Sequence, residues 1–266
     1  MTKKEQNILI KEYLKTQNKE KKVIHFKEKD PGIIDKIREK IPAKAMNSLE
    51  TAFEKGFFFL FDKGGVIIEK TGSIEKSRKN SEKFHKSLAL MVRSGTLKAI
   101  DQATGSKINI SKGTATLEGI SLGIFGIGLP DIPIFLAMLL KTSYEIAANY
   151  GFDYREEKER KYTLSLLKVI FSEGTEREAY SKQCDILGEA IDKGDALDAE
   201  LSDNDLKAVS SVLATDMLVA KFIQGMTFVG VLGGPLNYRL INKVSKVAKI
   251  KYKKRFLFKL IQNSED

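Results

Sequence analysis

Three polar residues in the middle of the chain have side chains suited to acid–base chemistry. Asp131 and Asp153 are carboxylates that could act as general acid and base or hold a hard cation, and Tyr150 lies between them in the sequence. A cleft built from these three residues would make the protein a soluble helical enzyme of hydrolase type. However, Asp131 stands where a helix cap is expected, and Gly151 stands where the same helix would end. A helix of about 20 residues, rising about 1.5 Å per residue, would hold the two carboxylates about 30 Å apart. The spacing therefore favours Asp131 as a helix cap and Asp153 as a loop residue or as the cap of the next helix.

The rest of the sequence offers little for catalysis or metal binding. Its only cysteine is Cys184, and its two histidines, His25 and His85, are not neighbours in the sequence. This composition excludes an intramolecular disulfide and argues against a zinc site. No Gly-x-Ser-x-Gly or His-Glu-x-x-His motif is present, and Cys184 falls on the apolar face of an expected helix, which predicts a buried structural thiol. We therefore expect no metal and no cofactor, and the carboxylate cleft remains the catalytic alternative.

The net charge of +10 is concentrated at one end of the chain. Residues 239–260 contain nine basic residues and no acidic one, whereas residues 185–205 contain eight acidic residues and one basic residue, Lys193. Outside residues 239–260 the net charge is only +1. A chain polarised in this way is expected to present a basic surface to an anionic partner, which could be a membrane surface, nucleic acid or an acidic protein.

The basic C-terminal residues occur in a pattern typical of an amphipathic helix. On a helical wheel the apolar residues between Leu240 and Ala248 fall within about 120° of one another, and Lys243, Lys246 and Lys249 fall on the opposite side. Such a helix, followed by aromatic residues, is typical of segments that lie in the headgroup plane of an anionic membrane. The alternative is a core helix with a solvated lysine face, and nucleic acid is disfavoured because no known reader motif accompanies the basic run. The residues predicted to contact an anionic surface are Arg239, Lys243, Lys246, Lys249, Lys253, Lys254 and Arg255.

Two glycine-rich apolar stretches, residues 116–140 and 222–238, are the least ordinary parts of the sequence. Neither provides the roughly 20 uninterrupted apolar residues of a spanning helix, because an aspartate and prolines divide the first and glycines and Pro235 divide the second. Glycine costs about 1 kcal/mol inside a helix, so such clusters need a reason. Gly119 and Gly123, four residues apart, would let another helix approach closely. Both stretches are interpreted either as tight helix contacts in a soluble bundle or as membrane-contacting segments. A phosphate-binding loop is disfavoured because its motifs are absent.

The elements that must position these residues are helices. The apolar periodicity predicts an all-α fold, a multi-helix bundle with two glycine-rich apolar helical segments and a basic amphipathic C-terminal helix. Residues 1–29 are expected to be a charged lead-in, partly disordered or forming a frayed helix, without a secretion signal, and residues 30–262 a single helical domain. Ser202 and Asp205 have the spacing of a capping box. Helices are expected at about residues 33–57, 88–100, 131–150, 175–191 and 205–224, and residues 71–87 as a connection or an exposed helix.

At several of these positions the sequence resembles the EcsC family. The segment GIGLPDIPIFLAMLLKTSYEIAANYGFDY, residues 126–154, is similar to a family block that joins a glycine-rich lead, Asp-x-Pro, an apolar helix and a Tyr-Gly-Phe-Asp end. Residues 221–256 resemble the closing block, a glycine-rich apolar segment followed by Asn-Tyr and a basic helix, although Gly234-Pro235 departs from it. A looser match covers residues 41–56, so that the resemblance extends over roughly residues 33–258. The family-motif residues are Gly126, Gly128, Pro130, Asp131, Pro133, Tyr150, Gly151, Asp153, Gly230, Asn237 and Tyr238.

The resemblance implies a helical, cytoplasmic or membrane-associated protein of unsettled activity, since the founding member is encoded beside an ABC transporter concerned with protein secretion. With the apolar stretches and the basic helix, it leads us to expect a non-catalytic accessory protein, peripheral at the inner face of the membrane. The expected partners are an anionic membrane surface or lipid and an ABC transporter or other membrane protein, and not nucleic acid. The soluble enzyme with a cleft around Asp131, Tyr150 and Asp153 is the alternative.

Overall fold

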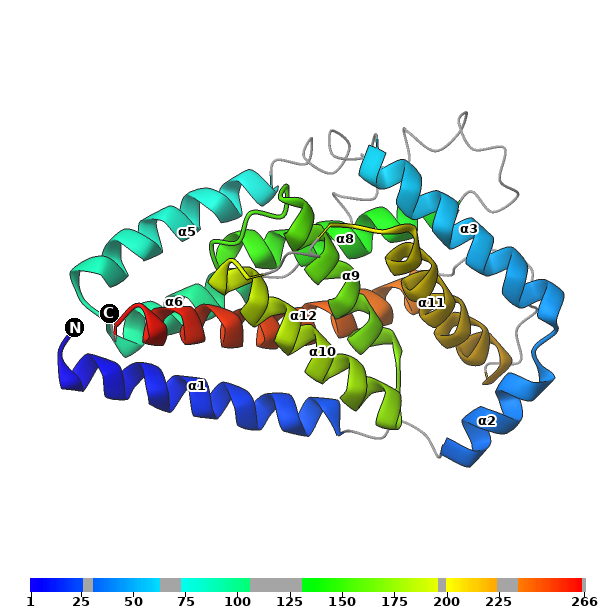
Figure 1. Ribbon diagram of the computed structural model, residues 1–266, viewed down its shortest axis with the longest axis horizontal. Helices are drawn as coiled ribbons and strands as arrows, with labels where there is room; N and C mark the ends of the chain where they lie inside the picture. The colour runs from blue at the N-terminus through cyan, green and yellow to red at the C-terminus, as the bar shows by residue number, and fades with distance from the viewer. Residues whose placement is uncertain (26–30, 63–72, 106–130, 196–199, 224–233, 265–266) are drawn as a thin grey trace.

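The chain folds into a bundle of α-helices, as the apolar periodicity predicts (Figure 1). The structure, a computed structural model, describes residues 1–25, 31–62, 73–105, 131–195, 200–223 and 234–264. Within these ranges there are ten helices and no strand. They are α1 (Lys3–Ile24), α2 (Pro31–Lys40), α3 (Ala43–Asp62), α5 (Ser73–Leu90), α6 (Ser94–Gly105), α8 (Asp131–Asn149), α9 (Glu157–Phe171), α10 (Gly174–Lys193), α11 (Asp203–Ile223) and α12 (Gly234–Gln262).

Helix α8 is one of two central helices of the bundle. Residues 132–149 are buried except for Ile134 and Glu145, which are partly buried, because α8 is apolar almost all round and is covered by α3, α5, α6 and α12. Some of its polar side chains bond within the helix, as where the Thr142 hydroxyl donates to the Met138 carbonyl at 2.8 Å, and the Asn149 amide also donates to the Ser77 hydroxyl of α5 at 2.8 Å. The second half of the first glycine-rich stretch is therefore a core helix, whereas residues 116–130 lie outside the described residues.

Helix α3 approaches α8 closely at a glycine. A Cβ atom on Gly56 would lie only 2.8 Å from Cδ1 of Leu136 and 3.5 Å from Cγ2 of Ile132, so a larger residue would require the Leu136 side chain to shift. One turn earlier on α3, Phe53 packs against Phe135 with ring centroids 6.4 Å apart. The C-terminal turns of α3 thus lie against the N-terminal turns of α8.

Helix α12 is the second central helix and runs in the same direction as α8 (Figure 1). Its first half follows the prediction: Leu240, Ile241, Val244, Val247 and Ala248 are all buried. From Lys251 to Leu257 the helix is buried on nearly every side, because α1, α8, α9 and α10 surround it. The predicted amphipathic pattern is therefore confirmed in the first half of α12, whereas Lys253, Lys254 and Arg255, predicted to contact an anionic surface, are buried or partly buried in the second half.

Most of residues 1–29, expected to be a frayed or partly disordered lead-in, form a regular helix, α1. Residues 3–24 form one helix that lies antiparallel to α12 and buries Leu9, Thr16, Glu20 and Ile24 (Figure 1). It begins at a complete capping box, in which Thr2 and Glu5 each bond the other's backbone N–H. Composition alone suggested a solvated segment, but tertiary contacts with α12 hold the helix in place.

Local sequence signals account for some of the helix ends. Gly151, with φ +85°, ends α8 in a Schellman motif, in which the Phe152 N–H donates to the Ala147 carbonyl at 3.0 Å. The capping box predicted before α11 is present, with the Asp205 N–H donating to the Ser202 hydroxyl at 3.2 Å. The helix predicted across residues 88–100 is instead interrupted between α5 and α6, where the Val92 N–H donates to the Glu5 carboxylate of α1 at 3.0 Å.

None of the helices described is both long and apolar enough to cross a membrane.

The Glu5 carboxylate gives α1 a pH-dependent attachment. Hydrogen bonds from the Thr2 backbone and side chain and from the Val92 N–H lower the pKa of Glu5 from 4.5 to about 2. Because the folded pKa is depressed, the stabilising contribution of Glu5 is complete above pH 4.5 and is lost as the pH falls toward 2. We expect the NMR resonance of the Val92 amide to shift with a midpoint near pH 2, and Glu5→Gln to abolish that titration. A midpoint near 4.5 would show that Glu5 does not bind this amide in solution.

Candidate functional site

The first half of α12 carries the predicted cationic residues that face solvent. Arg239 and Lys246 are exposed. Lys243 is partly buried; its ammonium lies 3.7 Å from an Asp216 carboxylate oxygen and 5.8 Å from the centre of the Phe171 ring. Among the residues predicted to contact an anionic surface, the exposed ones therefore lie in the first half of α12; in the last turn, Lys259 is also exposed and lies 3.9 Å from an Asp192 carboxylate oxygen.

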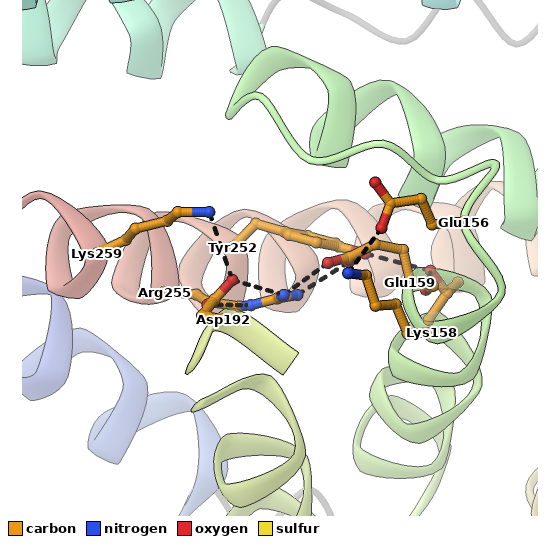
Figure 2. A network of polar contacts seen from close by, with 8 residues as sticks. Glu156, Lys158, Glu159, Asp192, Tyr252, Arg255 and Lys259 are labelled. Atoms are coloured by element: carbon orange, nitrogen blue, oxygen red, sulfur yellow. Dashed lines mark hydrogen bonds and ion pairs between the residues drawn. The ribbon is translucent and has the colours of Figure 1, made fainter. Parts of the chain in front are cut away.

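Arg255, by contrast, is buried between two carboxylates. Its guanidinium makes paired hydrogen bonds to Glu159 of α9, at 2.6 and 2.9 Å, and to Asp192 of α10, at 2.6 and 2.9 Å (Figure 2). The planar group is stacked between Phe152 and Tyr162, with ring centres 4.3 and 4.5 Å away. Burial alone would lower the pKa of Arg255, but the Glu159 and Asp192 carboxylates raise it above its usual value. This one side chain therefore joins α12 to α9, to α10 and to the turn after α8.

A second cationic cluster joins α12 to α1 and α10. The Lys251 side chain is 0% exposed, and its ammonium contacts Glu20 at 2.5 Å and Asp185 at 2.8 Å and donates to the Ser181 hydroxyl at 2.7 Å. Lys254 binds the other oxygen of the same two carboxylates. Burial by itself would lower the pKa of Lys251, but the surrounding Cys184, Glu20 and Asp185 side chains raise it. The Lys251 and Lys254 ammonium groups and the Glu20 and Asp185 carboxylates thus form a ring of four ion pairs.

The third cluster is centred on Asp101 of α6. Its carboxylate accepts hydrogen bonds from Lys253 at 2.6 Å and from the Tyr150 hydroxyl at 3.0 Å, and its backbone carbonyl accepts one from Lys249. Lys253 also binds Glu12 of α1 at 2.6 Å. Burial would raise the pKa of Glu12, but the Lys253 ammonium lowers it below its usual value. Asp101 therefore ties α6, α12 and the end of α8 together.

These clusters change the interpretation of the predicted anion-contacting residues. Lys253, Lys254 and Arg255 do not form part of an exposed cationic face but bind carboxylates of the same chain, and Lys249 is half buried against Asp101. Sequence reasoning missed the fully buried Lys251. It also missed the carboxylates that neutralise α12, namely Glu12, Glu20, Asp101, Glu159, Asp185 and Asp192. The acidic tract at residues 185–205, next to the basic one, was the available signal, because it supplies Asp185 and Asp192.

A cleft of about 510 Å³ opens between α5 and the turn that follows α8. Two arginines on its rim are already paired: Arg78 with Glu75 and Glu82, and Arg155 with Asp153. The Arg155 hydrogen bonds lower the pKa of Asp153. The other lining residues include His85, Gly151 and Phe152. The charges of this cleft are thus largely neutralised within its own walls.

The structure does not bring the catalytic candidates together. The Tyr150 hydroxyl points to Asp101 in the core, whereas Asp153 lies in the cleft and binds Arg155. Asp131 begins α8, and the helix, at about 1.5 Å per residue, places it roughly 27 Å from the end that precedes Asp153. The side chain of Asp131 lies outside the described residues. The proposed enzyme cleft of Asp131, Tyr150 and Asp153 is therefore not assembled.

The remaining family-motif positions fall into two groups. Pro133 is buried in the first turn of α8, and Gly151 occupies the left-handed turn after it. Gly126, Gly128, Pro130 and Gly230 lie outside the described residues, as do the side chains of Asn237 and Tyr238 at the start of α12. Cys184 is buried, and burial raises the pKa of its thiol, as expected for a structural cysteine. In the part of the chain that the structure describes, no three His, Cys, Asp or Glu side chains lie together as a metal site would require.

The fold and these clusters define an all-α protein whose C-terminal cationic helix is neutralised at the centre of its own bundle. A family model described as the EcsC protein family matches residues 5–257, and the chain belongs to this family. It is 27% identical over 142 residues to "Uncharacterized protein YdbA" of Bacillus subtilis (strain 168), covering 49% of this chain and 52% of that protein. It is 25% identical over 146 residues to "Protein EcsC" of the same organism, covering 54% of this chain and 58% of that protein. The chain thus spans about half the length of the curated relatives it matches, and no solved structure matches it significantly.

The Arg255 cluster yields a stability prediction. Arg255→Met should lower the free energy of unfolding by about 3–5 kcal/mol, because it leaves two buried carboxylates without their cation. Adding Glu159→Gln and Asp192→Asn should recover part of this loss. The control is Lys158→Met, which removes an exposed ammonium 3.0 Å from Glu156 (Figure 2) and should change stability by less than about 0.5 kcal/mol. Urea denaturation measures all three, and a loss below about 1 kcal/mol for Arg255→Met would contradict the assigned role.

Gly151 yields a second prediction, on the shape of the cleft. A Cβ atom at this position would lie 2.5 Å from Nε2 of His85, whose ring packs edge-on against Phe256. Gly151→Ala should therefore cost about 1–2 kcal/mol for the left-handed backbone and about 0.5–1.5 kcal/mol more for displacing His85. Gly174→Ala, at φ +57° with open space around it, should show only the backbone cost. Chemical denaturation of both variants separates the backbone cost from the cost of displacing His85. Equal losses of stability in the two variants would mean that His85 does not pack against Gly151.

Proposed function

We propose that this protein is a non-catalytic accessory protein that binds peripherally to an anionic membrane surface. The observation that carries the proposal is the relative direction of the two core helices. Helices α8 and α12 run in parallel, and each is directly preceded in the sequence by a glycine-rich apolar segment, residues 119–130 and 224–233 respectively (Figure 1). Both segments therefore join the bundle at the same end, where together they can supply one apolar contact surface.

A large exposed apolar side chain lies beside the attachment point of each segment. Ile223, the last residue of α11, directly precedes residues 224–233 and is 48% exposed. Phe58, in the C-terminal turns of α3 that lie against the start of α8, is 64% exposed. Each segment therefore has an exposed apolar side chain beside it that could extend an apolar contact surface.

Cationic residues at the start of α12 support an anionic surface in particular. Arg239 and Lys246 are exposed in the turns that follow the second apolar segment. Each basic residue near an anionic leaflet contributes about 1 kcal/mol to binding. Peripheral binding at the inner face of the membrane would place the protein beside integral membrane partners, and an ABC transporter or another component of protein secretion is the partner that we propose.

Flotation with lipid vesicles tests this function. We expect the protein to float with phosphatidylglycerol vesicles at low salt and to float poorly with phosphatidylcholine vesicles. Ile124→Ser with Phe125→Ser should weaken binding at least about tenfold, because burying each of these side chains contributes about 1.5–3 kcal/mol. Leu90→Ser is the matched control, since Leu90 is an exposed apolar residue on α5 at the opposite end of α8, and it should bind as the wild type does. A wild-type protein that stays in the soluble fraction with anionic vesicles at low salt would contradict the proposal.

A further inference from the structure

Helix α1 covers a row of lysines on α12. Lys251, Lys253 and Lys254 each bind a carboxylate of α1, Glu12 or Glu20, and Lys249 lies on the same part of α12. We call Lys249, Lys251, Lys253 and Lys254 the lysine strip. The aromatic ring of Phe258 continues the strip and packs on Tyr13 of α1, with ring centroids 6.1 Å apart.

The charge of the strip depends on whether α1 is present. With α1 in place, four lysines face four carboxylates, two from α1 and two, Asp101 and Asp185, from α6 and α10. Without α1, the same four lysines face only Asp101 and Asp185, so these six side chains together carry a net charge of +2, with an aromatic ring beside them. That combination of lysines and an aromatic side chain is what binds at the headgroup level of an anionic membrane.

Some of the contacts of α1 favour its detachment from α12. The apolar side chains that it buries fully are Leu9 and Ile24, whereas Ile10 and Leu14 are exposed on its outer face. The partly buried Ile8, Tyr13 and Val23 also pack against the core. Among the ionic contacts of α1 with α12, the one made by Glu12 is partly exposed to solvent, where salt and competing anions weaken such pairs. The Arg255 cluster differs, since α9 and α10 enclose it and α1 contributes none of its charged partners.

We propose that α1 is a detachable cover and that the lysine strip beneath it binds the phosphate groups of an anionic membrane once α1 has moved. Glu12 and Glu20 occupy in the closed protein the places that lipid phosphates take in the open one. This inference rests on the proposed function and adds a regulated contact to the apolar end of the bundle. Helix α12 would then connect the two contacts, because the second apolar segment precedes it and the strip lies in its second half.

Two sets of variants test the cover. Glu12→Gln with Glu20→Gln should loosen α1; the matched control, Glu39→Gln with Glu54→Gln, removes the same charge from α2 and α3. Conversely, Tyr13→Cys with Phe258→Cys, joined by a short bismaleimide crosslinker, should hold α1 closed, and the buried Cys184 should not compete for the reagent. Hydrogen exchange of the α1 amides without lipid reports whether α1 is loosened, and flotation with phosphatidylglycerol vesicles reports binding.

We expect the loosened variant to exchange its α1 amides faster and to bind the vesicles about tenfold more tightly than the control, and the crosslinked protein to bind least. A crosslinked protein that binds as tightly as the same protein before crosslinking would overturn the cover and leave membrane binding intact. Faster α1 exchange without tighter binding would also overturn it. If neither the wild type nor the loosened variant binds, the proposed function itself fails. Tighter binding of the loosened variant to duplex DNA than to vesicles would overturn the lipid assignment.

Discussion

The burial of a cationic helix is the constraint on which this fold depends. Burying the charged guanidinium of Arg255 would be very costly without Glu159 and Asp192, and the group also packs against the flat faces of Phe152 and Tyr162. These four partners come from α9, α10 and the turn after α8, so one side chain fixes the relative positions of several elements. The lysine strip does the same on the other side of α12, where it positions α1, α6 and α10.

This constraint also explains how charge is distributed along the chain. The basic C-terminal residues and the acidic tract before them are not two independent surfaces, because Asp185 and Asp192 meet α12 inside the bundle. The net charge of +10 therefore overstates what α12 presents to solvent, where the exposed basic residues are Arg239, Lys246 and Lys259. The cationic surface open to a partner depends on the position of α1 rather than on composition alone.

Local features of the fold could be predicted from the sequence because their causes are local. The extent of α8 follows from its apolar run and from Gly151, and the start of α11 follows from Ser202 and Asp205. The partners of α12 could not be predicted in this way. A helical wheel gives the direction of Lys253 but does not tell whether solvent or Glu12 lies there, because that depends on a helix more than 200 residues away in the sequence. The same long-range contact made α1 ordered where its composition predicted fraying.

The most direct test of the account is the reactivity of the α12 lysines in the folded protein. Brief labelling with an amine-reactive ester, followed by mass spectrometry, compares Lys246, which is exposed, with Lys251 and Lys253, which are buried and paired. The account predicts rapid labelling of Lys246 and strong protection of Lys251 and Lys253 in the absence of lipid, for as long as α1 stays on α12 and the protein remains folded. Labelling of all three lysines at the same rate in the native protein would contradict it.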